Sequence, residues 1–179
     1  MDQQLRDFVI DRFSAVHAAI PCVDYPQWSR VDRLDTRPSA TLGYREATAG
    51  PLFLETYLDR PVEDCVSAVM GRDIPRHAIV EIGCLAAMPS RALVQLWCDT
   101  AKALQGSHQF AVATLTRPLR KMLERAGLPL VPIAKAEAAL VNNAESWGGY
   151  YQLDPVICAG DIAAGATALA AFAARHQRG

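Results

Sequence analysis

Two apolar runs, separated by a segment with helical spacing, constrain the fold of this chain more than any other feature. The run His77 to Ala86 is almost continuously apolar and is interrupted by Glu81 and Gly83, which is typical of a strand buried on both faces. Apolar side chains then recur at helical spacing over 93–104, and a second apolar run, Gln109 to Leu115, follows. The order strand, helix, strand predicts a βαβ unit and an α/β fold.

Weaker patterns predict the remaining elements. In chain order these are a helix over 2–20, a loop over 21–38, a strand over 39–47, an extended segment over 52–58, a short helix capped by Asp59 and ended by Gly71, a helix after Thr116 with Leu119, Met122 and Leu123 inward, a strand over 128–134, a short helix over 135–140, a strand over 156–159 and a helix over 161–176. The first helix packs either on the domain or on a second subunit, so a homodimer is one expectation. We expect residues 1–38 to form an N-terminal helix and linker, and residues 39–179 to form one domain.

The composition excludes several kinds of partner and site. A net charge of −1 with no run of basic residues argues against nucleic-acid binding and favours small molecules or proteins. The five cysteines are odd in number and lack metal-ligand spacing, so neither a disulfide framework nor a metal site is expected. The first twenty residues carry several charges, and no stretch approaches the ~18 continuous apolar residues of a membrane span. These features predict a cytoplasmic protein without stable membrane insertion.

Glu81 is the strongest candidate for a catalytic group. No segment matches a phosphate-binding loop, a dinucleotide fingerprint, a nucleophile elbow or a metalloprotease helix. An ionised carboxylate inside a buried strand is costly, so Glu81 is expected to be paired, protonated or facing a cleft. A raised pKa would suit it to general base catalysis. The structural alternative is a buried ion pair with Arg76 or Arg45.

Cys84 is a second candidate on the same strand. A regular strand places it on the face opposite Glu81, unless Gly83 introduces a bulge. A buried thiol would be inert, whereas a nucleophilic one needs a histidine partner, and His77 is the nearest in the sequence.

Polar side chains of the preceding segment could bind a substrate. Glu55, Tyr57 and Asp59 share one face if this segment is a strand, and they could converge on an amine or a hydroxyl. The alternative is a solvent-exposed face on which Asp59 only caps a helix. Arg45 could bind a carboxylate or phosphate, or pair with a neighbouring acid.

An aromatic loop follows later in the chain. Trp147, Tyr150 and Tyr151 surround two glycines, which is more aromatic than a simple connection requires. The loop could cover an acyl or peptide-like ligand, fold onto the core through its own rings, or contact a membrane.

Five segments in order, within a matching region of about Thr41 to Ile162, resemble the thermostable hemolysin family, whose pattern is similar to that of GNAT-like N-acyltransferases, including acyl-homoserine-lactone synthases. These segments are GYREA, LFLETYLDRPVE, RHAIVEIGCLA, TLTRPLRKMLERAGL and WGGYYQLDPVICAGDI. The resemblance implies a mixed, mostly antiparallel central sheet with helices on both faces. It also implies that the strand ending near Ala86 and the strand 109–115 are splayed apart to admit a pantetheine arm.

The resemblance also implies roles for individual residues. Glu81 takes the place of the catalytic base. The side chains of Arg45, Glu55, Asp59 and Arg76 fall in a charged cleft for an amino-acid-derived acceptor, with Tyr57, Trp147 and Tyr150 beside it. The donor would contact Leu85, Ala86, Ala87 and Thr114. No permanently bound cofactor is expected, and the cosubstrate would be acyl-CoA or the phosphopantetheine of an acyl carrier protein.

Two departures from the family pattern bear on function. Cys84 stands where the family usually has asparagine, so hydrogen bonding by that amide is lost or changed. The glycine-rich pyrophosphate turn is replaced by residues 86–90, AAMPS, although backbone N–H groups at that helix start could still bind a phosphate. On the basis of the resemblance, we expect an acyltransferase. The alternatives are a membrane-active hemolysin and a non-catalytic GNAT-like binding protein.

Overall fold

A computed structural model describes residues 3–21, 24–35, 37–88 and 91–176. Its centre is a six-stranded sheet with the order β1-β2-β3-β4-β6-β5. The strands are β1 (Gln27–Asp32), β2 (Pro38–Glu46), β3 (Ile79–Ala87), β4 (Phe110–Leu115), β5 (Leu130–Lys135) and β6 (Val156–Asp161). The β3–β4 pair is parallel, and the four other neighbouring pairs are antiparallel. The sheet is therefore mixed and mostly antiparallel.

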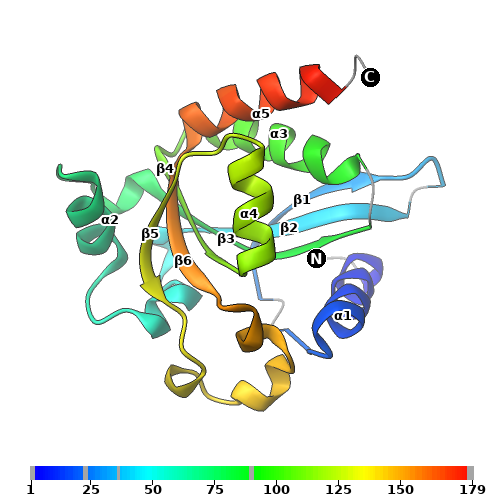
Figure 1. Ribbon diagram of the computed structural model, residues 1–179, viewed down its shortest axis with the longest axis horizontal. Helices are drawn as coiled ribbons and strands as arrows, with labels where there is room; N and C mark the ends of the chain where they lie inside the picture. The colour runs from blue at the N-terminus through cyan, green and yellow to red at the C-terminus, as the bar shows by residue number, and fades with distance from the viewer. Residues whose placement is uncertain (1–2, 22–23, 36, 89–90, 177–179) are drawn as a thin grey trace.

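Helices cover both faces of the sheet (Figure 1). They are α1 (Gln3–His17), α2 (Val62–Met70), α3 (Ala92–Leu104), α4 (Arg117–Arg125) and α5 (Ile162–His176). Alternating side chains of β4 separate two cores: Phe110 and Val112 pack toward α2, whereas Ala113 and Leu115 pack toward α3, α4 and α5. The helix α1 packs on β3 and contributes Val9 and Phe13 to a third, smaller cluster.

The predicted βαβ unit is confirmed by β3, α3 and β4. Gly71, at a φ of 67°, ends α2 in the left-handed conformation as expected. Strands β2, β5 and β6 and helices α1, α4 and α5 also occur where the patterns predict them, with bounds shifted by a few residues. The predicted short helix over 135–140 is reduced to a 3-10 turn, Ala138–Leu140.

Four local predictions are wrong. The predicted loop over 21–38 contains β1, which pairs with β2. The segment predicted as extended over 52–58 forms a 3-10 helix, η2 (Phe53–Tyr57). Pro61, rather than Asp59, occupies the N-cap of α2. Met122 is 39% exposed and does not face the core. The division of the chain at residue 38 stays a prediction.

The strands β3 and β4 separate after four residue pairs. Their parallel pairing runs from Ile79–Phe110 to Ile82–Ala113, and both strands then continue without further mutual pairs among the described residues. On the other edge of β3, Thr41 pairs with Ala86 and Gly43 with Gly83, so β3 contains one extra residue. The result is a β-bulge beside a splayed strand pair.

Cys84 lies in this bulge at a φ of 49°, a left-handed conformation that few residues other than glycine adopt. Its side chain packs on the cluster formed with α1, whereas the next residue, Leu85, packs toward α3. The predicted alternative, a bulge at Gly83, is therefore present, and it turns Cys84 to the face that carries Glu81. No helix in the described part of the chain combines the length and the apolar character needed to cross a bilayer.

Candidate active site

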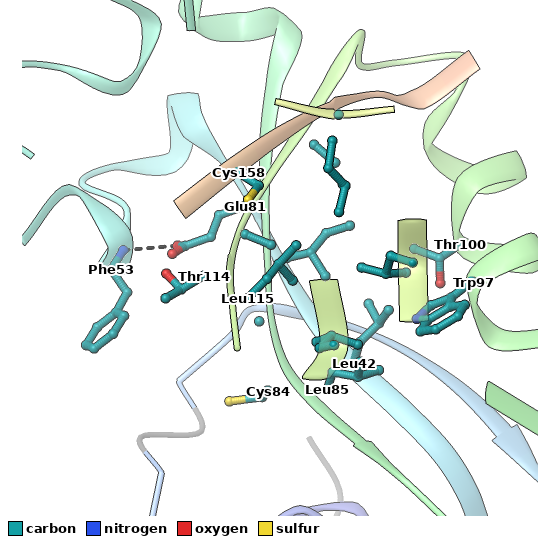
Figure 2. A pocket seen from close by; sticks show the side chains of 18 of the residues that line it. Leu42, Phe53, Glu81, Cys84, Leu85, Trp97, Thr100, Thr114, Leu115 and Cys158 are labelled. Carbon is teal, nitrogen blue, oxygen red and sulfur yellow. Dashed lines mark hydrogen bonds between the residues drawn. The ribbon is translucent and has the colours of Figure 1, made fainter. Parts of the chain in front are cut away.

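One cavity of about 360 Å³ opens where β3 and β4 separate, and its walls include residues from both faces of the sheet. This volume lies within the range of about 300–1,000 Å³ that small-molecule sites occupy. Figure 2 shows Glu81, Thr114 and Phe53 at one end and Leu42, Leu85 and Trp97 at the other. The splay thus joins a chamber beside η2 and α1 to a compartment beneath α3, α4 and α5.

Glu81 lies in the wall of the first chamber, and its side chain binds the start of η2. The residue is 2% exposed. Its Oε2 accepts the N–H of Phe53 at 3.0 Å (Figure 2), and its Oε1 accepts the N–H of Leu54 at 2.9 Å. Two N–H groups at a helix start are therefore satisfied by a carboxylate from a distant strand.

Burial raises the pKa of Glu81, and the N–H groups of Leu54 and Phe53 oppose that rise. Neither of the predicted ion pairs, with Arg76 or with Arg45, forms in the described structure. Each oxygen of a carboxylate has a second lone pair, so Glu81 retains the capacity to accept a proton from a ligand in the cavity.

Arg76 lies at the centre of a separate charged network. Its guanidinium donates to Glu55 at 2.7 Å and to Glu63 at 2.6 Å, and also to the carbonyl oxygens of Ala47 and Gly50. The paired guanidinium, with further N–H donors from the backbone, lowers the pKa of Glu55 to about 2. Glu55 also accepts the N–H groups of Leu52 and Val62, so the network ties the N-terminal end of η2 to the start of α2.

The predicted acceptor wall is not assembled as a strand face. Glu55 and Tyr57 lie in the 3-10 helix η2 and Asp59 lies beyond its end, so the strand alternation that would place all three on one face is absent. Tyr57 is buried and its hydroxyl lies 2.8 Å from that of Tyr151, whereas the Asp59 side chain is 93% exposed beside Arg60. The cavity is lined by Tyr57 but not by Glu55, Asp59 or Arg76, so substrate contact by these three stays a prediction that the cavity does not support.

Arg45 is a cavity residue with partners of its own. It donates to the carbonyl oxygens of Asp24 and Pro51 and pairs with the Asp24 carboxylate at 3.7 Å. Its guanidinium also lies over the ring of Tyr25, at 5.9 Å from the centroid. Arg45 therefore contributes positive charge to the chamber while it holds the segment before β1.

Tyr25 lines the cavity and is not among the residues predicted from the sequence. Its ring lies against Gly43 and Gly83, which face each other on β2 and β3, and a Cβ at either glycine would overlap it. Glycine inside a strand often marks a close approach of this kind, and the two glycines were the available signal.

Aromatic rings form the remaining wall of this chamber. The ring centroid of Trp147 lies 5.6 Å from that of Phe53 and 5.3 Å from that of Tyr150, and the ring centroid of Tyr150 lies 5.4 Å from that of His17 of α1. The Tyr150 hydroxyl donates to the carbonyl oxygen of Thr114 at 3.1 Å, at the splayed end of β4. The predicted aromatic loop thus packs on the core and also lines the cavity. His17, which was not identified from the sequence, has a pKa lowered by burial, and its Nδ1 has no partner among the described residues.

The compartment on the other face is apolar. Its walls come from one stripe of each helix and from small or aliphatic residues of the sheet; they include Leu42, Ile82, Leu85, Trp97, Ala101, Leu104, Ala111, Ala113, Leu115, Leu119, Leu123, Cys158, Ile162 and Leu169. The polar exceptions are Thr100, Thr116 and Asp161, of which Asp161 accepts the N–H of Ala164. Thr100 is 3% exposed, and its hydroxyl has no hydrogen-bond partner among the described residues. An apolar cavity of only ~150 Å³ already stays dry and binds small hydrocarbons, so this compartment suits a hydrocarbon chain.

The predicted donor contacts are divided between the cavity and its surroundings. Leu85 and Thr114 line the cavity, whereas Ala86 and Ala87 lie on β3 outside its lining. The helix start predicted to bind a phosphate includes residues 89 and 90, which lie outside the described residues. Within the described residues, no group of three or more His, Cys, Asp or Glu side chains could hold a metal ion.

The sheet order, the splayed strand pair and the helices on both faces define a GNAT-like fold of the kind found in acyl-homoserine-lactone synthases. The synthase BjaI, solved with SAM and isopentyl-CoA, matches with a TM-score of 0.66 and 16% identity over 97% of this chain and 80% of its own. FeeM, an N-acyl amino acid synthase from uncultured soil microbes, matches with a TM-score of 0.61 and 13% identity over 92% of each chain. TofI, in a ternary complex with an inhibitor and MTA, matches with a TM-score of 0.60 and 11% identity over 94% of this chain and 91% of its own. At such identities the likeness shows the fold.

The chain belongs to the thermostable hemolysin family, whose family model matches residues 1–166. No curated protein matches the sequence. The predicted family and the predicted GNAT-like architecture are therefore confirmed.

Proposed function

We propose that this protein is an acyltransferase that moves an acyl group from a thioester donor to the amine of a small, amino-acid-like acceptor. The observation that carries the proposal is the single cavity that joins two chemically different spaces through the splay of β3 and β4. The compartment under α3, α4 and α5 fits an acyl chain, and the chamber with Glu81 and Arg45 fits an amine acceptor. The thioester carbonyl would lie between them.

The chemistry needs a base in the acceptor chamber. The amine nitrogen attacks the thioester carbonyl carbon, a C–N bond forms, the C–S bond breaks, and the thiolate leaves. Glu81 receives the proton that the amine loses, directly or through water, and the proton passes on to solvent or to the thiolate. A carboxylate with a raised pKa is a stronger base than an ordinary one, which supports this role.

The donor would enter along the open edges of the splayed strands. Beyond Ile82 and Ala113 the two strands no longer bond to each other, so a pantetheine arm could pass between them. The Thr114 carbonyl oxygen at this edge accepts the Tyr150 hydroxyl and keeps a second lone pair for an amide of the arm. Leu85 and Thr114 line this passage. Because acyl-CoA and acyl carrier protein share the phosphopantetheine arm, the proposal includes both as donors.

The acceptor would lie among Arg45, Tyr25 and the Phe53–Trp147 ring pair. The guanidinium of Arg45 offers charge for a carboxylate, and the rings offer apolar and cation–π contacts. The SAM bound in BjaI and the N-acyl amino acid named as the product of FeeM support an amino-acid-derived acceptor.

The direct test is a transfer assay with purified protein. Acyl-CoA and acyl carrier protein donors are incubated with a panel of amino acids and amines, the released thiol is measured with a chromogenic reagent, and the amide is identified by mass spectrometry. We expect acceptor-dependent thiol release that Glu81→Gln abolishes and that Glu124→Gln, an exposed carboxylate on α4, leaves unchanged. Absence of both thiol release and amide with every donor and acceptor would contradict the proposal.

A further inference from the structure

A glycine in the middle of α5 has no packing reason for lacking a side chain. Gly165 is buried, yet a Cβ built on it meets no heavy atom within 4 Å. Glycine inside a helix costs stability, by roughly fivefold in the folding equilibrium relative to alanine, and most neighbours of Gly165 on α5 are alanine. A buried residue that faces empty space faces an internal cavity.

That empty space belongs to the apolar compartment. Gly165 lines it together with Ile162 and Leu169, which lie on the same stripe of α5. The facing stripe of α3 contributes Trp97, Thr100, Ala101 and Leu104. The packed helices α3 and α5 therefore enclose the part of the cavity beneath Gly165.

The sheet opposite is also lined by small side chains. Ala111 and Ala113 of β4 and Cys158 and Gly160 of β6 contribute to the cavity wall. Larger side chains at these positions or at Gly165 would fill the space. The compartment is thus kept open from the helix side and from the sheet side.

We propose that Gly165 determines the length of the acyl chain that the protein accepts, by leaving room between α3 and α5 for the distal end of a long chain. This inference rests on the proposed function, because it assigns the compartment to the acyl group of the donor. Each buried methylene changes the affinity by about fourfold. A side chain that excludes two methylenes from the cavity should therefore lower the affinity for long-chain ligands by about 15-fold.

The test compares chain-length profiles in binding. S-alkyl-pantetheine thioethers of increasing chain length are titrated by calorimetry into the wild-type protein, Gly165→Leu and Ala170→Leu. Ala170 is an exposed residue of the same helix, so its variant is the matched control. We expect affinity to rise with chain length in the wild type and the control, and to stop rising at a shorter chain in Gly165→Leu, with short-chain affinity preserved.

Ala101→Leu on α3 supplies a second, independent variant from the facing wall, in case Gly165→Leu does not fold. It should shorten the accepted chain in the same way. Gly165→Ala should raise the unfolding midpoint, since the helix gains a better former and the added methyl meets no atom.

The outcomes separate this inference from the proposed function. If the folded variants bind only shorter alkyl chains and no acyl transfer is detected, the inference would be supported and the transferase proposal contradicted. Transfer activity with an unchanged profile in Gly165→Leu and Ala101→Leu would overturn the inference alone. Failure of every thioether to bind the wild type would overturn both.

Discussion

Replacement of Glu81 by glutamine tests whether this carboxylate holds η2 in place as well as serving the cavity. In the wild type both carboxylate oxygens accept backbone N–H groups, from Phe53 and from Leu54. A glutamine keeps one oxygen, whereas its amide nitrogen is a donor and would face the other N–H. One of the two N–H groups is therefore left buried without an acceptor.

The expected cost follows from these two contacts. A hydrogen bond to a charged acceptor contributes about 1.5–3 kcal/mol, and a buried N–H without a partner costs about 1–3 kcal/mol. Removal of a buried charge offsets part of this loss, since burial raises the pKa of Glu81. We expect Glu81→Gln to lower the free energy of unfolding by about 2 kcal/mol.

The assay is urea unfolding combined with hydrogen exchange at the amides of Phe53 and Leu54. Exchange at one of these amides should accelerate in Glu81→Gln while amides of α3 are less affected. Thr100→Val is the matched control: its hydroxyl is buried without a partner, so its replacement by a methyl of similar shape should not destabilise the protein. An unchanged unfolding free energy together with unchanged exchange at both amides would refute the reasoning.

Two further predictions concern the supports of the cavity. Arg76 lowers the pKa of Glu55 from 4.5 to about 2, so the stability from this pair should be complete above about pH 4.5 and lost as pH falls toward 2. Urea unfolding of Arg76→Gln should show a free energy of unfolding lower by ~3 kcal/mol at neutral pH and a smaller change of that free energy between pH 4.5 and 2. An unchanged pH dependence of the unfolding free energy would contradict the pairing. Gly148 has a φ of 51°, and a Cβ on it would overlap the backbone of His17 and Ala18, so Gly148→Ala should cost at least ~2 kcal/mol and speed hydrogen exchange in α1; protection of α1 equal to the wild type would show that this contact does not matter.

The sequence was most informative where one local pattern decides the structure. The apolar run with Glu81, the helical stripe of α3 and the run of β4 identify the βαβ unit, because burial on both faces leaves few alternatives. β1 was missed because it is an edge strand: its exposed and half-buried residues surround a single buried valine, Val31, and give no alternating pattern.

The nature of η2 could not be predicted because distant residues determine it. Its N-terminal N–H groups are bound by Glu81 on β3, and its Glu55 is bound by Arg76 before β3. The residues that were predicted to bind substrate, Glu55 and Arg76, pair with each other instead, a choice that depends on the register between segments and leaves no trace in local spacing. Glu81 could be recognised as a candidate catalytic group because a carboxylate inside an apolar run is unusual.

Gly165 is visible in the sequence as a glycine within an alanine-rich helix, but its relation to the cavity follows only from the packing of the helices. A glycine in an alanine-rich helix lowers helix propensity, and by sequence alone it indicates only a weaker helix. The packing of α3 against α5 turns it into an opening of the cavity.

The measurement that tests the central claim most directly is photocrosslinking with an alkyl-pantetheine thioether whose chain ends in a diazirine, followed by mapping of the labelled residues by mass spectrometry. We expect labels on the α3 and α5 stripes, at Ala101, Ile162, Gly165 and Leu169, and we expect a thioether of equal length without the diazirine to suppress them. Competable labelling of α1 or η2 with none on α3 and α5 would contradict the claim that the acyl chain passes between β3 and β4.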